Sequence, residues 1–313
     1  MFDSVAFSQI ISGYPPTDIL LGNGFESRFD ARSPCNRKFV YNPPEDSPEP
    51  NLTLFRGGDC NIRLRAQSSL PKLFFGSNVQ LFTSQSQINQ TLENFSNFVT
   101  EKTTIEFNAF NCFLNRVDFT KDLYVGESKI SLLINELARF NLSRFKRCPV
   151  DDLSVTFMSK TRLIGKQSSK AIKIYDKYRE FITHQNVKHA DLKMALGVAR
   201  FEYSYLKTAT VKRLAKKLKL KNCLARTILT ESVAERVMQM DEFRLCLDKV
   251  NHLGETKLQK LRRHYSLSKA MDLWAFSQAI YELGEDFYLR HGGMCRQTYK
   301  KKAALLRAAG VWV

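Results

Sequence analysis

Alternation of apolar and polar residues predicts β-strands in the first two-thirds of the chain. The expected strands are 61–67, 110–120, 154–160, 161–165, 171–177 and 199–205. Apolar residues at helical spacing, such as Ile88, Leu92 and Phe95, predict a helix over 84–102, and a similar pattern predicts another over 128–145. The proline- and acid-rich stretch near 42–51 is expected to be a loop or disordered.

The pattern changes at about residue 207. The segment 207–221 carries seven basic residues and no acidic one, and the rest of the chain has helical spacing and no proline. A glycine pair precedes the basic helix predicted within 291–310, and a glycine follows it. We therefore expect an α+β fold: a domain over 1–206, with a largely antiparallel sheet and flanking helices, and a basic helical domain over 207–313.

The charge of the chain points to a polyanionic partner. Its 313 residues carry a formal net charge of +17, which favours nucleic acid first and an acidic membrane surface second. No stretch of 18 apolar residues exists, and the start has no basic region of the kind that opens a secretory signal. The cysteine count is odd and no pair has CxxC spacing, which argues against a disulfide framework or a zinc knuckle. These features together predict a cytoplasmic protein with reduced thiols and no membrane partner.

Three of the predicted strands each have one face that carries charge. On these strands Asp118, Tyr175 and Glu202 lie opposite apolar residues, because side chains alternate between the two faces of a strand. If the strands belong to one sheet, the three side chains converge on one face. Flanking cations are then expected beside them: Arg116, Lys173, Lys177 and Arg200.

This set of residues suits phosphodiester chemistry. A tyrosine can attack a phosphodiester, but its ordinary pKa of ~10 means that it needs help from a metal ion or from cations. Two carboxylates can hold Mg²⁺ or Mn²⁺ through hard oxygen ligands. The simpler alternative is that Asp118 and Glu202 form surface ion pairs with Arg116 and Arg200.

At these residues the chain resembles the phage and plasmid replication initiation proteins of the gene II/X type, typified by the filamentous-phage gene II protein. The resemblance lies in an Arg-hydrophobic-Asp strand, a Tyr-x-Lys motif, an Arg-Phe-Glu strand, a Ser-x-x-Lys…Gly-x-Asn segment and a C-terminal helix. In this chain those stretches are 114–120, 172–180, 198–207, 68–78 and 296–311. Each motif is short, but they occur in the family's order over most of the chain.

The resemblance implies a rolling-circle initiator that nicks one strand of a double-stranded origin and later rejoins it. Tyr175 would be the nucleophile that stays joined to the 5′ phosphate, with Lys177 as its catalytic partner. Asp118 and Glu202 would be the metal ligands for Mg²⁺ or Mn²⁺. Many rolling-circle initiators instead hold the ion with a His-hydrophobic-His pair, which this sequence lacks. The implied partners are origin DNA, the displaced single strand, and a helicase and polymerase of a bacterial host cell.

Other interpretations stay open. Residues 160–167 contain a Gly-Lys pair but lack the other P-loop residues, so we expect no nucleotide cofactor and a separate helicase. A non-catalytic DNA-binding regulator of phage or plasmid replication would need the charge but not Tyr175, and 210–228 is compatible with a helix-turn-helix. Tyr178 is the alternative nucleophile. The expected DNA-binding residues are Arg116, Lys173, Arg200, Lys212, Arg213, Lys216 and Lys217.

Overall fold

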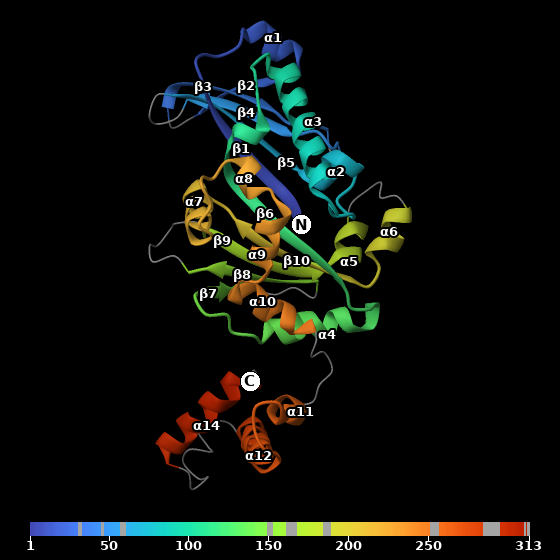
Figure 1. Cartoon of the computed structure of the whole chain (residues 1–313), viewed down its shortest axis with the longest axis vertical. Coiled ribbons are helices and arrows are strands. Elements are labelled where there is room, and N and C mark those ends of the chain that lie inside the picture. Colours follow the sequence, from blue (N-terminus) through green and yellow to red (C-terminus); the bar gives the residue numbers. More distant parts are fainter. Residues whose placement is uncertain are drawn as a thin grey trace.

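The computed structural model describes residues 1–30, 33–44, 47–56, 61–148, 153–160, 168–183, 189–250, 257–283, 295–309 and 311. Within these residues the fold is α+β, which confirms the predicted class: helices pack against a ten-stranded antiparallel sheet (Figure 1). The predicted strand at 161–165 lies outside the described residues.

The sheet is built from strands of both halves of the chain. Their order across it is β2-β3-β4-β5-β1-β6-β10-β9-β8-β7. The strands are β1 (Phe2–Ile11), β2 (Glu26–Asp30), β3 (Ser33–Tyr41), β4 (Asn51–Arg56), β5 (Ile62–Ser69), β6 (Phe113–Tyr124), β7 (Phe145–Arg147), β8 (Ser154–Ser159), β9 (Lys170–Asp176) and β10 (Val198–Tyr205).

The first strand of the chain, β1, lies near the middle of the sheet, between β5 and β6. Phe2, Val5 and Phe7 are buried, and so are the intervening Asp3 and Ala6. A strand buried on both faces lacks a clear polar alternation, so the sequence pattern predicts no strand here.

Fourteen helices or helical turns have bounds within the described residues. They are α1 (Thr17–Gly22), α2 (Leu70–Phe75), α3 (Gln85–Thr103), η1 (Ala109–Asn111), α4 (Glu127–Ala138), α5 (Lys177–Ile182), α6 (His189–Ala195), α7 (Thr208–Lys217), α8 (Ala225–Ile228), α9 (Glu231–Met238), α10 (Asp241–Asp248), α11 (Lys257–Arg262), α12 (Leu267–Leu283) and α14 (Arg296–Ala308). None of the described helices has the combined length and apolar character needed to cross a membrane.

One face of the sheet, here called the covered face, is apolar and carries most of the helices. Aromatic contacts tie the helices to it: Phe7 meets Phe95 of α3, and Tyr203 stacks on Phe243 of α10 with ring centroids 5.8 Å apart. The opposite face of β6, β10 and β9, here called the polar face, carries the charged residues. The two faces of the sheet therefore differ in the side chains that they carry: the covered face packs apolar residues against helices, and the polar face gathers charged ones.

The hydrophobic core continues past residue 206, the end of the predicted first domain. Val211, Leu214 and Phe243 belong to the same buried cluster as the strands, because α7 to α10 cover the sheet. A second cluster lies within 261–311 and joins α11, α12 and α14, which Figure 1 shows as a separate group. The domain boundary itself stays a prediction.

The predicted helix over 128–145 is shorter than expected. It ends at Ala138 as α4, and Phe145 begins strand β7. Arg144 has a positive φ of 67°, which breaks helical geometry just before that strand. By contrast, the helix predicted over 84–102 is present as α3, with a Ser84 side chain capping its start.

Candidate active site

The polar face brings the three predicted chemical residues together. In the antiparallel ladder, Glu202 of β10 lies opposite Thr120 of β6 and Lys173 of β9. On the same strand, Ser204 lies opposite Asp118, and Arg200 lies opposite Tyr175. Residues directly opposite each other share a face. The predicted convergence of Asp118, Tyr175 and Glu202 on one face is therefore present.

Tyr175 and Glu202 form the central contact of this face. The Tyr175 hydroxyl donates a hydrogen bond of 2.6 Å to Glu202 Oε1, and the Tyr175 residue is only 4% exposed. Burial, and then the negative charge of Glu202, raise the pKa of Tyr175 well above 10. Burial and the charge of Asp3 raise the pKa of Glu202 to about 7. The pair thus consists of a neutral phenol and a carboxylate that can gain or lose a proton near neutral pH.

Two lysines flank the Tyr175 ring, as the sequence predicts. The ammonium nitrogens of Lys173 and Lys177 lie 4.4 and 5.7 Å from the ring centre. Lys177, however, is not on the strand: β9 ends at Asp176, whose side chain caps α5, and Lys177 is the first residue of that helix.

Two hydrogen bonds hold the Lys177 ammonium in place. Its ammonium donates to Asn78 Oδ1 at 3.1 Å and to Glu180 Oε2 at 2.8 Å, and its side chain is 1% exposed. Burial, and then the nearby Arg200, lower the pKa of Lys177. It is therefore a fixed cation beneath Tyr175 rather than a solvated one.

Arg200 is also buried and fully engaged. Its guanidinium pairs with Asp122 at 2.6 and 2.7 Å and donates to the backbone carbonyls of Asn78 and Val79. The open alternative of a Glu202–Arg200 surface pair is thus not what the structure has. A DNA-binding role for Arg200 stays a prediction, and its present contacts position the loop after α2 against the site.

Asp118 is paired with Arg116 in this structure, and its role as a metal ligand stays a prediction. Arg116 donates to both Asp118 oxygens, with distances of 2.5 to 3.1 Å, and Asp118 is buried. Glu202 Oε1 accepts the hydrogen bond from the Tyr175 hydroxyl. Among the described residues, no group of three or more His, Cys, Asp or Glu is arranged to hold a metal ion.

Sequence reasoning missed several residues of this site. Asp3, on β1, accepts a hydrogen bond of 2.6 Å from Ser69, and its charge acts on Glu202. Asn78 is the last residue of the Gly-x-Asn segment that carries the resemblance, but the sequence reasoning assigned it no role. Thr120 has a buried hydroxyl without a hydrogen-bond partner in the described part of the chain. Such a hydroxyl marks a place where water or a substrate oxygen can bond.

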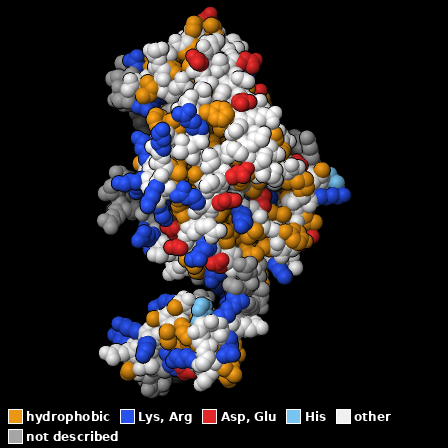
Figure 2. Space-filling view, in the orientation of Figure 1, with side chains coloured by type: hydrophobic (Ala, Val, Ile, Leu, Met, Phe, Trp, Pro, Cys, Tyr) orange, Lys and Arg blue, Asp and Glu red, His pale blue; other side chains and the backbone are white. Residues whose placement is uncertain are grey.

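The four predicted DNA-binding residues of α7 lie on the other side of the sheet. α7 packs on the covered face through Val211 and Leu214, and Thr208 bonds Asn115 of β6. The exposed side of the helix carries Lys212, Arg213, Lys216 and Lys217. Figure 2 shows lysine and arginine side chains gathered along this side of the molecule. The structure therefore does not bring these cations to Tyr175.

Comparisons with known proteins supply no family. No protein-family model matches the chain, and no curated protein matches it. The crystal structure of DynU16, a protein in the dynemicin biosynthetic locus, aligns with 79% of this chain and 95% of its own at 8% identity, with a TM-score of 0.20. A similarity this low supports no statement about fold or function, so the functional argument depends on the site itself.

Proposed function

We propose that the chain is a rolling-circle DNA replication initiator that nicks one origin strand through Tyr175 and later rejoins it. The observation that carries the proposal is the Tyr175–Glu202 hydrogen bond, with two lysine ammonium groups beside the phenol. Stretches far apart in the sequence meet here: Asn78, Tyr175 with Lys177, and Glu202 come from three of the motifs that resemble the initiator family. The implied substrates are double-stranded origin DNA and the displaced single strand.

The residues of the site can perform the nicking step as follows. The Tyr175 oxygen bonds to phosphorus and the phenol proton passes to Glu202, while the bond from phosphorus to the 3′ oxygen breaks and that oxygen leaves as a 3′-hydroxyl after taking a proton from water. A carboxyl group with a pKa of about 7 suits this work, because it can accept the proton and return it when the strand is rejoined. Lys173 and Lys177 stabilise the negative charge that develops in the transition state.

We propose that a movement of Lys173 gives the DNA access to Tyr175. Its ammonium lies over the ring of the buried tyrosine, and its long side chain can turn away at low cost. A DNA phosphate would attract that ammonium away from the ring and toward itself. The same residue would thus uncover the nucleophile and bind the group that it attacks.

The proposal retains a requirement for Mg²⁺ or Mn²⁺, which a chelator tests. No step is assigned to the ion, because Arg116 engages both oxygens of Asp118. If Arg116 releases Asp118 when DNA binds, hard oxygen ligands of the kind that Mg²⁺ prefers become available. Arg116 and Lys173 are the proposed phosphate contacts of this face.

The second candidate is a non-catalytic DNA-binding regulator. The observation that favours it is the exposed basic side of α7, which lies away from Tyr175 and can bind phosphates without it. Such a regulator would shift DNA in a gel but form no covalent link.

The deciding experiment incubates the protein with supercoiled plasmids that carry the DNA around its gene, with Mg²⁺ or Mn²⁺. Initiator activity predicts nicked plasmid and protein–DNA adducts that survive denaturing detergent. A mobility shift without nicks or adducts would instead support the regulator.

A further inference from the structure

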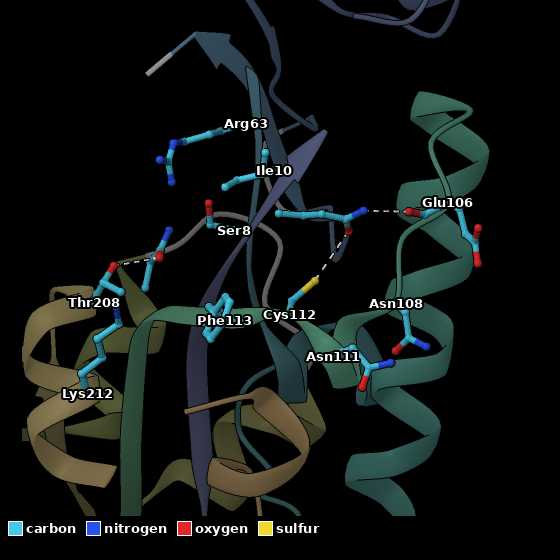
Figure 3. A pocket seen from close by; sticks show the side chains of 12 residues that line it. Ser8, Ile10, Arg63, Glu106, Asn108, Asn111, Cys112, Phe113, Thr208 and Lys212 are labelled. Carbon is cyan, nitrogen blue, oxygen red and sulfur yellow. Dashed lines mark hydrogen bonds between the residues drawn. The ribbon is translucent and has the colours of Figure 1, made fainter. Parts of the chain in front are cut away.

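A hollow of about 580 Å³ lies at the end of β6 far from Tyr175, where β1, η1 and α7 meet (Figure 3). Its lining includes Phe113, Arg63, Lys212, Asn108 and Asn111. Hollows of this size hold small organic ligands in many proteins. The nicking site uses none of these five residues.

Phe113 provides an exposed ring on a fixed backbone. The residue is 50% exposed, which is unusual for phenylalanine in a protein of this size. Its backbone is paired on both sides, with Ser8 of β1 and with Leu224 after α7. The ring is therefore a water-accessible platform on a paired backbone, of the kind on which a nucleobase can stack.

Cations border the hollow from two elements. Arg63 comes from β5 and Lys212 from α7, and Figure 3 shows them on different sides of Phe113. The exposed row of α7 continues from Lys212 to Lys216, on a helix that contains no acidic residue. The phosphate backbone of a nucleic acid with one nucleotide in the hollow can therefore continue along α7.

Amide side chains supply groups that can recognise a base edge. Asn108 and Asn111 are both exposed, and each amide offers a donor and an acceptor. A stacking ring, amides and cations together match the three parts of a nucleotide: base plane, base edge and phosphate.

We propose that this hollow binds an unpaired base of single-stranded DNA, with the adjoining phosphates along α7. The strand must be single, because a paired base has both faces stacked and cannot reach the Phe113 ring. The choice of DNA over RNA rests on the proposed function, in which a displaced DNA strand leaves the origin. The hollow would then hold that strand apart from the nicking site.

The test measures fluorescence anisotropy of a labelled 12-nucleotide DNA strand with the full-length chain. EDTA is present throughout, so binding is scored independently of nicking. Phe113→Ala should weaken binding by about 5- to 150-fold, the range of one base–aromatic stack, while Phe113→Trp retains it. The matched control is Phe29→Ala, which removes another exposed ring outside the hollow and should change nothing.

A strand series assigns the effect to a base. Strands with one abasic site, moved along the sequence, should include one that binds the wild type as weakly as the intact strand binds Phe113→Ala. With the Phe113→Ala variant, that abasic strand and the intact strand should bind equally well, because the stacking contact is already lost. Free thymidine monophosphate at equal concentration should not compete.

Three results would overturn the proposal. If Phe113→Ala binds the strand as tightly as the wild type and has the same melting temperature, the Phe113 ring does not stack on a base. Equal losses for Phe113→Ala and Phe29→Ala make the effect non-specific. If RNA of the same sequence binds more tightly than DNA and its binding depends on Phe113, the ligand of the hollow is RNA and not DNA. None of these results affects the covalent-adduct assay, so the hollow and the nicking proposal can fail separately.

Discussion

Cations at the Tyr175 site and cations along α7 are held in opposite ways. Lys177 and Arg200 are buried, and each is fixed by carboxylate and amide or carbonyl partners. Lys212 and Lys216 on α7 are exposed to solvent. Buried, fixed charges suit a transition state because they need little rearrangement. Solvated charges suit phosphate contacts that tolerate any sequence. The difference is in line with our proposals, which assign chemistry to the polar face and strand binding to α7.

Removing the proposed nucleophile, Tyr175, should have the largest effect of the proposed changes. Tyr175→Phe should abolish nicking and the covalent adduct, while DNA affinity stays within about twofold because α7 is untouched. The lost hydrogen bond should cost about 1 kcal/mol of unfolding free energy. Tyr178→Phe is the matched control and should keep most activity. Nicking by Tyr175→Phe at the wild-type rate would remove the site from consideration.

Glu202→Gln should slow adduct formation by about 10²- to 10⁴-fold, the usual effect of losing a general base. The wild-type rate should rise as pH increases through about 7, because the carboxylate must be ionised to accept the phenol proton. The variant should lose this rise. A pH–rate profile shared by both proteins would mean that Glu202 does not receive the proton.

Replacing Lys212, Arg213, Lys216 and Lys217 with Gln should weaken DNA binding and leave the fold intact, since all four are exposed. Each lost phosphate contact should reduce the slope of log affinity against log salt by about 0.9 on duplex DNA. Anisotropy titrations at several salt concentrations measure that slope. An identical slope in the variant would show that α7 does not contact the DNA backbone.

The pKa of Glu202 also predicts how stability depends on pH. Its folded value is about 7 and its ordinary value is 4.5, so the folded state binds more protons in this window. The contribution of Glu202 to stability is therefore complete below pH 4.5 and is lost as pH rises to about 7. The loss should approach ~3 kcal/mol, since one pKa unit corresponds to ~1.4 kcal/mol. Urea unfolding across this range should show the decline in wild type and a flatter curve in Glu202→Gln.

The smallest expected effect is on stability, and it is measured by replacing one lysine from each region. Lys177→Met should lower the unfolding free energy by about 1–3 kcal/mol, because it leaves Asn78 and Glu180 without their buried partner. Lys212→Met should change it by less than about 0.5 kcal/mol, as is usual at exposed positions. Equal melting temperatures for the two variants would contradict the difference in burial on which the comparison depends.

Local alternation was enough to predict which residues share the polar face. A one-residue shift would have buried charge in the core, so Asp118 and Glu202 could be assigned to a face from their apolar neighbours alone. The same rule failed for Lys177, because Asp176 caps a helix and ends the strand one residue earlier. A cap depends on local backbone geometry, which the period-2 pattern does not contain.

Contacts between distant segments could not be predicted from the pattern. Asp3 and Asn78 reach the site only because β1 pairs with β6 and the loop after α2 meets Arg200. The position of α7 on the covered face follows from the apolar side of β10, which needs a helix against it. Basic composition led us to predict that α7 binds phosphates, and that stays a prediction; the composition gave no information about which face of the sheet α7 covers.

The most direct test of the account identifies the residue that carries DNA after nicking. Trypsin places Tyr175 in the peptide 174–177 and Tyr178 in the peptide 178–179, so mass spectrometry of the digested adduct separates the two. We predict a 5′-phosphonucleotide on Tyr175. A nucleotide on Tyr178 or on any other residue, or nicked DNA without an adduct, would contradict the assignment of the Tyr175–Glu202 pair as the nicking site.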